Sequence, residues 1–307
     1  MKSAVVAIVG RTNAGKSTLV NNLVGEKISI VSPVEQTTRN MVRGIVADPR
    51  GQLVLLDTPG LHKAVGNLGR LLNRIARRTS AGADILCVVF DASCAPQMED
   101  AGWMARVASE KPQKVLFVLN KSDRKPFFES MYKDAWNEAL SNADSGDGNA
   151  EGAPDPVWTT AASNMPGGAD SVAAALFDMA EEGEPLFPED IVTDYPRRFA
   201  IADSIREKFL ARLHGEVPHE LGIVVGKIDE NGGEWKVSAD VLVNRPSQKP
   251  IVVGRGAENV KYARKCAERE LSSVFGVKIR LELWVKVEPL WMRNDRLLSA
   301  MGYLDAE

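Results

Sequence analysis

The segment GRTNAGKS, residues 10–17, combines residue types and a spacing that suit phosphate binding. It matches the pattern G-x-x-x-x-G-K-[ST] and lies between an apolar run and a helix-like segment, which is the context that this pattern requires. Glycines allow the backbone to turn its N–H groups toward phosphate oxygens, and the start of the helix adds partial positive charge. Lys16 is expected to reach the β- and γ-phosphates of a nucleotide, and Ser17 to bind Mg²⁺. The other residues expected to contact the nucleotide here are Gly10, Arg11, Thr12, Asn13, Ala14, Gly15 and Thr18.

The tetrapeptide DTPG begins at the last residue of the apolar run LVLLD. Asp57 is expected to hold the Mg²⁺ through a water molecule, and the Gly60 N–H to contact the γ-phosphate, with Thr58 and Pro59 between them. In many nucleotide-hydrolysing switches the next residue is a glutamine that orients the attacking water. Here it is Leu61, a further expected nucleotide contact, whose side chain neither donates nor accepts a hydrogen bond. Something else must therefore orient the water, such as backbone groups, γ-phosphate oxygens or a bound cation.

The tetrapeptide NKSD follows the apolar run KVLFVL, at the end of a strand where open α/β sheets bind ligands. The carboxylate of Asp123 can accept hydrogen bonds from N1–H and the exocyclic amine of guanine. Adenine offers no donor at either position, so it would leave this carboxylate unpaired, at a cost of several kcal/mol. Lys121 is expected to pack its stem over the base, and Asn120 to tie this loop to the phosphate loop. Ser122 completes the loop, and the Ala161 N–H is expected to face the guanine O6.

The three motifs in this order predict an enzyme that hydrolyses GTP to GDP and phosphate, with slow intrinsic turnover. A metabolic kinase or ATPase that merely uses a phosphate loop is the competing class, and Asp123 argues against it. Between the first two motifs lies VEQTTRN, in which a threonine can bind Mg²⁺ only when the γ-phosphate is present. Thr37 and Thr38 are both candidates, and Thr38 is slightly favoured.

Asn13 is a candidate for replacing the side chain that is missing at position 61. An amide at this position of the phosphate loop can help to hold a monovalent cation against the phosphates, as related GTPases of the same superfamily hold K⁺. Such a cation would supply the charge that an arginine finger supplies elsewhere. The alternative is that Asn13 only braces the loop. The expected catalytic set is Lys16, Thr38, Asp57, Gly60 and Asn13.

The elements that must position these motifs are short apolar runs that alternate with helix-like segments over residues 1–185. Runs at 4–9, 53–57, 84–90 and 114–120 are almost continuously apolar, which is typical of central parallel strands covered by helices on both faces. The stretch 41–48 alternates instead and is expected to be an antiparallel edge strand. The fold class is therefore α/β, with a mostly parallel sheet in the domain that carries the phosphate loop.

Two stretches interrupt this pattern. Residues 141–156 are acidic and rich in small residues, so they are expected to form a mobile surface loop, with an acidic interaction arm as the alternative. Residues 186–198 read as a linker, and 199–307 as a smaller α+β domain. Within it, residues 249–288 carry nine basic and five acidic residues, although the whole chain has a net charge of −3.

The ordered set GRTNAGKS, EQTTR, DTPGLHK and NKSD resembles the Era family of GTPases. The later stretches PEDIVTDYPRRF, SIREKFLARL, SQKPIVVGRGAENVK and LELWVKV are similar to the C-terminal KH domain of that family. The resemblance covers nearly the whole chain and implies a Ras-like GTPase domain followed by an α+β type II KH domain. The KH domain is expected to bind the 3′ end of small-subunit ribosomal RNA, with a role in assembly of the small ribosomal subunit. The resemblance also implies peripheral membrane association. The expected ligands are GTP and GDP, and the protein is expected to be a cytoplasmic monomer. The residues expected to contact RNA are Gly254, Arg255, Gly256, Ala257, Lys261, Arg264 and Lys265.

One position departs from the family pattern, because the last glycine of the G-x-x-G loop is Ala257. An alanine is strained where the backbone needs a positive φ, unless Gly256 takes the bend one residue earlier. A C-terminal domain that binds protein rather than RNA is the alternative function.

The composition agrees with an ordinary globular protein, since 44% of the residues are hydrophobic and 26% charged. The three cysteines show no metal-ligand spacing and no disulfide framework, so a reducing cytosol is expected. The sequence contains no run of 18 uncharged apolar residues, so no membrane span is expected.

Overall fold

The computed structural model describes residues 1–34, 37–60, 66–147 and 155–304. The chain forms two compact units. The first comprises Met1–Ser29, Met41–Ala64 and Leu72–Asp194, and the second comprises Ile30–Asn40, Val65–Leu71 and Tyr195–Glu307.

The first unit is built on one sheet with the strand order β2-β3-β1-β4-β5-β6, and β7 pairs with β1. Its strands are β1 (Lys2–Val9), β2 (Val42–Asp48), β3 (Gly51–Asp57), β4 (Ile85–Asp91), β5 (Val115–Asn120), β6 (Val157–Thr160) and β7 (Glu181–Glu182). The central pairs are parallel, whereas β2 lies antiparallel to β3 at the edge. The predicted mostly parallel sheet is confirmed, and so is the antiparallel edge strand.

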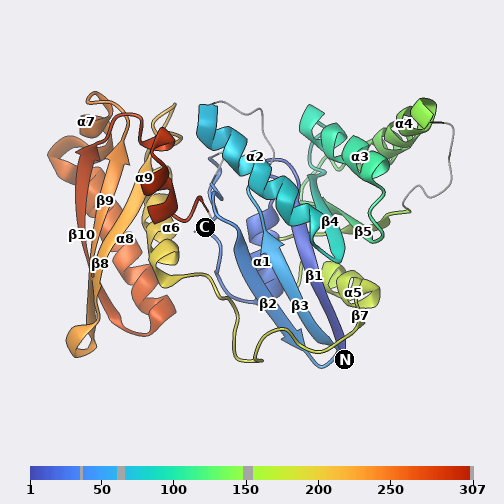
Figure 1. The fold of residues 1–307 in the computed structure, drawn as a ribbon, viewed down its shortest axis with the longest axis horizontal. Helices are drawn as coiled ribbons and strands as arrows, with labels where there is room; N and C mark the ends of the chain where they lie inside the picture. Colours follow the sequence, from blue (N-terminus) through green and yellow to red (C-terminus); the bar gives the residue numbers. More distant parts are fainter. Residues whose placement is uncertain (35–36, 61–65, 148–154, 305–307) are drawn as a thin grey trace. The chain divides into compact units, whose positions relative to one another are not determined.

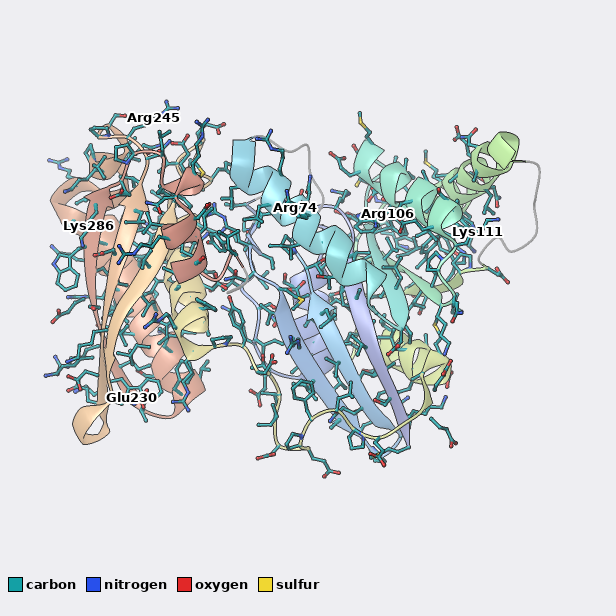
Figure 2. The ribbon with its side chains drawn as sticks, in the orientation of Figure 1. Arg74, Arg106, Lys111, Glu230, Arg245 and Lys286 are labelled. Carbon is teal, nitrogen blue, oxygen red and sulfur yellow. The ribbon has the colours of Figure 1, made fainter. Side chains whose placement is uncertain are left out.

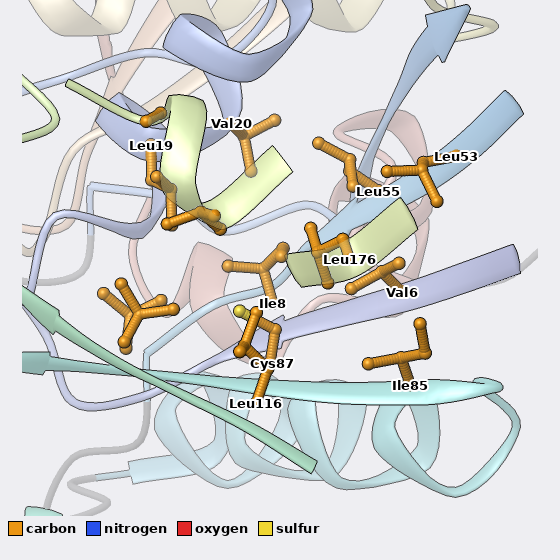
Figure 3. Packing of buried hydrophobic residues seen from close by; sticks show 14 of the residues in the cluster. Val6, Ile8, Leu19, Val20, Leu53, Leu55, Ile85, Cys87, Leu116 and Leu176 are labelled. Carbon is orange, nitrogen blue, oxygen red and sulfur yellow. The ribbon is translucent and has the colours of Figure 1, made fainter. Parts of the chain in front are cut away.

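Helices cover both faces of this sheet (Figure 1). They are α1 (Lys16–Val24), α2 (Gly66–Ala81), α3 (Met98–Glu110), α4 (Glu129–Asp147) and α5 (Asp170–Met179). Residues of β1 alternate between the two cores: Val6 and Ile8 pack with α1 and α5, whereas Ala7 and Val9 pack with α3 and α4. Figure 3 shows the first of these cores, in which Leu19 and Leu176 meet side chains of the central strands.

The second unit contains α6 (Arg197–Leu210), β8 (Gly222–Asp229), β9 (Glu234–Val243), α7 (Gln248–Val253), α8 (Glu258–Phe275), β10 (Lys278–Val287) and α9 (Asp295–Ala300). Its sheet has the order β10-β9-β8, with β9 parallel to β10 and antiparallel to β8. Apolar residues of α6 and α8 pack against this sheet, among them Ile205, Phe209 and Leu271.

Two stretches differ from their expected form. Helix α4 continues to Asp147, so the first part of the expected acidic loop is helical, and residues 148–154 lie outside the described residues. The expected linker is partly joined to the first unit, because Gln52 accepts hydrogen bonds from the N–H groups of Leu186 and Phe187. Ile45 donates to the Val192 carbonyl, which covers the open edge of β2.

Within the described residues, no helix combines the length and the apolar character that crossing a membrane requires.

Candidate functional site

The phosphate loop connects β1 to α1, and two of its glycines are needed for their lack of a side chain. Gly10 has φ +143°, and a Cβ there would lie 2.3 Å from the Val89 carbonyl oxygen. Gly15 has φ +99°, and a Cβ there would lie 2.3 Å from the Asn120 side-chain nitrogen. A larger residue would therefore push the loop away from the ends of β4 and β5.

Lys16 lies at the start of α1 and is almost completely buried. Its Nζ donates to the Arg11 carbonyl at 2.8 Å. Burial lowers the pKa of Lys16 to about 8, while the charge of Asp57 raises it and that of Arg11 lowers it. The DTPG turn comes close to this ammonium, since a Cβ on Gly60 would lie 2.9 Å from Nζ. The negative charge of phosphate oxygens at this place would compensate the buried positive charge of Lys16.

Asp57 lies at the carboxyl end of β3 and is completely buried. Neither of its carboxylate oxygens has a hydrogen-bond partner of ordinary geometry among the described residues. Burial raises the pKa of this carboxyl, an effect that the nearby Ser17 hydroxyl and Lys16 ammonium oppose. Uncompensated carboxylate oxygens beside a hydroxyl fit Mg²⁺, because this hard cation takes oxygen ligands. The residues present therefore suit the expected metal ion.

The NKSD loop is tied to the phosphate loop by two side chains. Asn120 donates from Nδ2 to the Ala14 carbonyl at 2.9 Å, and its Oδ1 accepts from the Ser163 hydroxyl at 2.7 Å. Lys121 donates from Nζ to the Asn13 carbonyl at 2.9 Å. Asp123 is exposed, so its carboxylate is accessible to a guanine base. The structure thus brings together the predicted phosphate and base loops.

The role expected for the Ala161 N–H is not supported by this structure. This N–H donates to the Leu119 carbonyl at 3.0 Å and so belongs to the ladder between β5 and β6. The Ala161 carbonyl accepts from the Ser122 N–H, also at 3.0 Å. The residue therefore supports the NKSD loop from behind, a role that its sequence neighbourhood alone does not reveal.

Sequence reasoning missed two buried carboxylates beside the phosphate loop. Asp91 ends β4, and Asp100 lies in α3; Arg11 forms ion pairs with both, at 3.3 and 3.1 Å. The guanidinium of Arg11 is therefore directed at protein carboxylates. A strand that ends in aspartate at the carboxyl edge of a parallel sheet was the available signal for Asp91.

The predicted magnesium-binding threonines fall in a segment, 30–40, that belongs to the second unit. The Thr37 hydroxyl donates to the Val34 carbonyl at 2.5 Å, and the Thr37 carbonyl accepts from Arg206 at 2.5 Å. Thr38 is half-buried. Leu61, the residue in place of the expected glutamine, lies outside the described residues.

The predicted RNA-binding loop joins α7 to α8. Both Gly256 and Ala257 adopt positive φ, at +59° and +62°, so the glycine does not spare the alanine. Lys261 donates from Nζ to the Gly256 carbonyl at 2.9 Å, while Arg264 and Lys265 are exposed on α8. Figure 2 shows the side chains of this unit, with Lys286 labelled on β10.

Two family models match the chain, one described as a 50S ribosome-binding GTPase over residues 5–121 and one described as a KH domain over residues 216–292. GTPase Era of Lacticaseibacillus paracasei is 34% identical over 309 residues, which cover 98% of this chain and 96% of the relative. GTPase Era of Rippkaea orientalis is 36% identical and covers 98% and 92%.

Solved structures agree over the same length. Era in complex with MgGDPNP and nucleotides 1506–1542 of 16S ribosomal RNA has a TM-score of 0.85 and 32% identity, covering 99% of this chain and 100% of that chain. A variant of Aquifex aeolicus Era bound to GDP·AlF₄⁻ has a TM-score of 0.84 and 31% identity with the same coverage. A Ras-like GTPase domain followed by a KH domain makes this chain a GTPase. Since the similarity extends over the full length, the chain belongs to the Era family.

Proposed function

We propose that this GTPase is a nucleotide-controlled switch that binds small-subunit ribosomal RNA and acts in the assembly and maturation of the small ribosomal subunit. The observation that carries the proposal is the exposed turn between α7 and α8, which is followed by the basic surface of α8. The backbone of such a turn can approach a phosphate chain closely. Further support comes from the Era relative whose structure contains 16S ribosomal RNA. The residues proposed to contact RNA are Gly254, Arg255, Gly256, Ala257, Lys261, Arg264 and Lys265.

In the proposed nucleotide site, the phosphate loop and Lys16 hold the β- and γ-phosphates, and Ser17 and Asp57 hold Mg²⁺. The metal ion would neutralise the charge that develops on the transferred phosphoryl group. Thr38 is the proposed additional ligand in the GTP state, and Thr37, whose hydroxyl donates to the Val34 carbonyl, is the alternative. Asp123 reads the guanine edge, and Asn120 and Lys121 hold its loop in place.

The proposal assigns the missing positive charge to a K⁺ ion held with the help of Asn13. This residue is exposed on the phosphate loop and adopts φ +61°. A cation there would assist hydrolysis without a side chain at position 61. The proposal also includes a cytoplasmic location, a monomeric state and peripheral membrane association, the last of which is based on the family resemblance. Fractionation of cells tests the location.

The deciding experiment is cosedimentation with small ribosomal subunits in the presence of GTP, GDP or a non-hydrolysable GTP analogue. We expect binding to depend on the nucleotide. Lys265→Ala should weaken binding to RNA and lower the slope of log affinity against log salt by about one. The matched control is Lys236→Ala, an exposed lysine on β9. Equal binding in all three nucleotide states, or crosslinking to protein without RNA, would contradict the proposal.

A further inference from the structure

Asp91 connects groups from three parts of the nucleotide site. It is the last residue of β4 and lies directly opposite Asn120 in the register with β5. Its Oδ2 accepts from Lys121 Nζ at 2.6 Å and lies 3.3 Å from the Arg11 guanidinium. Its Oδ1 accepts from the Ser93 hydroxyl at 2.5 Å. One carboxylate thus contacts the phosphate loop, the base loop and the turn after β4.

Lys121 depends on this carboxylate for its position. The residue adopts φ +63°, a left-handed conformation that an ordinary side chain reaches only when its surroundings hold it there. Its ammonium has two acceptors, the Asp91 carboxylate and the Asn13 carbonyl. Without Asp91, the ammonium would keep a single neutral acceptor, and the stem of Lys121 would lose its fixed direction across the base site.

Arg11 depends less on Asp91 than Lys121 does, because Arg11 forms an ion pair with a second carboxylate, that of Asp100. Asp100 accepts from Arg11 Nε at 3.1 Å and from the Tyr132 hydroxyl at 3.3 Å. Lys121 has no such second carboxylate among the contacts described. Loss of Asp91 therefore affects the base loop more than the phosphate loop.

The charge state of Asp91 agrees with this arrangement. Burial alone would raise the pKa of its carboxyl, but the hydrogen bonds from Lys121 and Ser93 and the charges of Lys121 and Arg11 leave the pKa below its ordinary value. Asp91 is therefore ionised at neutral pH and can hold the ammonium of Lys121 by a charge-assisted hydrogen bond.

We propose that Asp91 is a positioning residue for guanine recognition, which acts through Lys121 to hold the NKSD loop against the phosphate loop. The inference rests on the proposed nucleotide site. Asp91 touches neither base nor phosphate in this role, so its loss should matter most for ligands whose binding depends on the precise placement of Asp123.

The test compares GDP with inosine diphosphate, whose base lacks the exocyclic amine that Asp123 would accept from. In Asp91→Asn, GDP affinity measured by calorimetry should fall about tenfold, because a charged hydrogen bond is lost. The preference for GDP over inosine diphosphate should fall about threefold. The matched control is Asp84→Asn. Asp84 lies immediately before the same strand, and its exposed carboxylate accepts a hydrogen bond from the Val5 N–H. This variant should leave both affinities unchanged.

A double-mutant cycle with Lys121→Ala separates positioning from general stability. If Asp91 acts through Lys121, Asp91→Asn should change GDP affinity less than twofold once Lys121 is alanine. An additive cycle or an unchanged preference between the two nucleotides overturns the proposal. If Asp91→Asn does not fold, Ser93→Ala replaces it, because the Ser93 hydroxyl donates to Asp91. GDP affinity and the preference for GDP over inosine diphosphate are then measured for this variant. Asp123→Asn tests the guanine site itself, by a shift of preference to xanthosine diphosphate, and this outcome is independent of the cycle.

Discussion

Lys16 and Asp57 show at the residue scale what a nucleotide site requires of a folded protein. Both side chains are buried. Burial lowers the pKa of Lys16 and raises that of Asp57, so in each case it favours the neutral form. Protein groups compensate these charges only in part, because neither Asp57 oxygen has a hydrogen-bond partner of ordinary geometry among the described residues. Such a site favours binding of phosphate and Mg²⁺ over stability of the empty protein.

Asp57→Asn should therefore separate stability from activity. The nucleotide-free protein should gain about 1 kcal/mol of unfolding free energy, because the cost of burying the Asp57 charge, which the Ser17 hydroxyl and the Lys16 ammonium offset only in part, is removed. GTP turnover should fall by about two orders of magnitude, because one support of the metal ion is lost. Thermal unfolding and phosphate release at several Mg²⁺ concentrations check both effects. Asp48→Asn, at the other end of the β2–β3 hairpin, is the control; reduced stability of Asp57→Asn would contradict the argument.

Asn13 gives a second prediction at this scale. GTP hydrolysis should be faster in K⁺ than in Na⁺, and the difference should disappear when the amide is removed. The suitable change is Asn13→Gly rather than alanine, because φ is +61° here and glycine adopts this conformation without strain. Phosphate release is measured in matched K⁺ and Na⁺ salts. Identical rates of the unchanged protein in both salts would exclude the cation and leave Asn13 as a brace.

The apolar runs of the sheet were predictable at the scale of elements, because buried parallel strands have a local composition that identifies them. The partner of Asn120 in the phosphate loop was predictable too, since motif order implies that these loops meet. The engaged N–H of Ala161 was not, because strand pairing alone decides it. Helix α4 also extends further than its acidic, glycine-containing end suggested.

The start of α8 carries a prediction, because Ala257 precedes this helix with φ +62°. Ala257→Gly should raise the unfolding free energy by about 0.5–1 kcal/mol, because relief of the left-handed strain exceeds the added freedom of the unfolded chain. Denaturant unfolding measures this change. Ala263→Gly, within the same helix and buried, should instead destabilise. A loss of stability in Ala257→Gly would show that the alanine is not strained.

At the scale of the whole molecule, the boundaries of the two compact units cannot be inferred from the order of residues along the chain. Residues 30–40 precede most of the GTPase domain, yet they belong to the second unit. Arg39 donates to the carbonyls of Leu221 and His219 at 2.7 and 2.8 Å, and Arg206 donates to the Thr37 carbonyl. These contacts join residues far apart in sequence, and a buried arginine has no local pattern that would predict it.

The same contacts predict how the segment 30–40 responds when one is removed. Arg206→Met should loosen the segment, because the Thr37 carbonyl loses a charged donor, at a cost of about 2 kcal/mol. Arg39 is almost fully buried, so trypsin should cleave after it slowly in the unchanged protein and faster in the variant. Cleavage after the exposed Lys27 is the internal reference, and Arg198→Met, on the exposed side of α6, is the matched control. Because burial of Arg206 beside Arg39 lowers its pKa to about 10, its loss also relieves a repulsion. Unchanged cleavage after Arg39 would mean that this relief offsets the lost hydrogen bond.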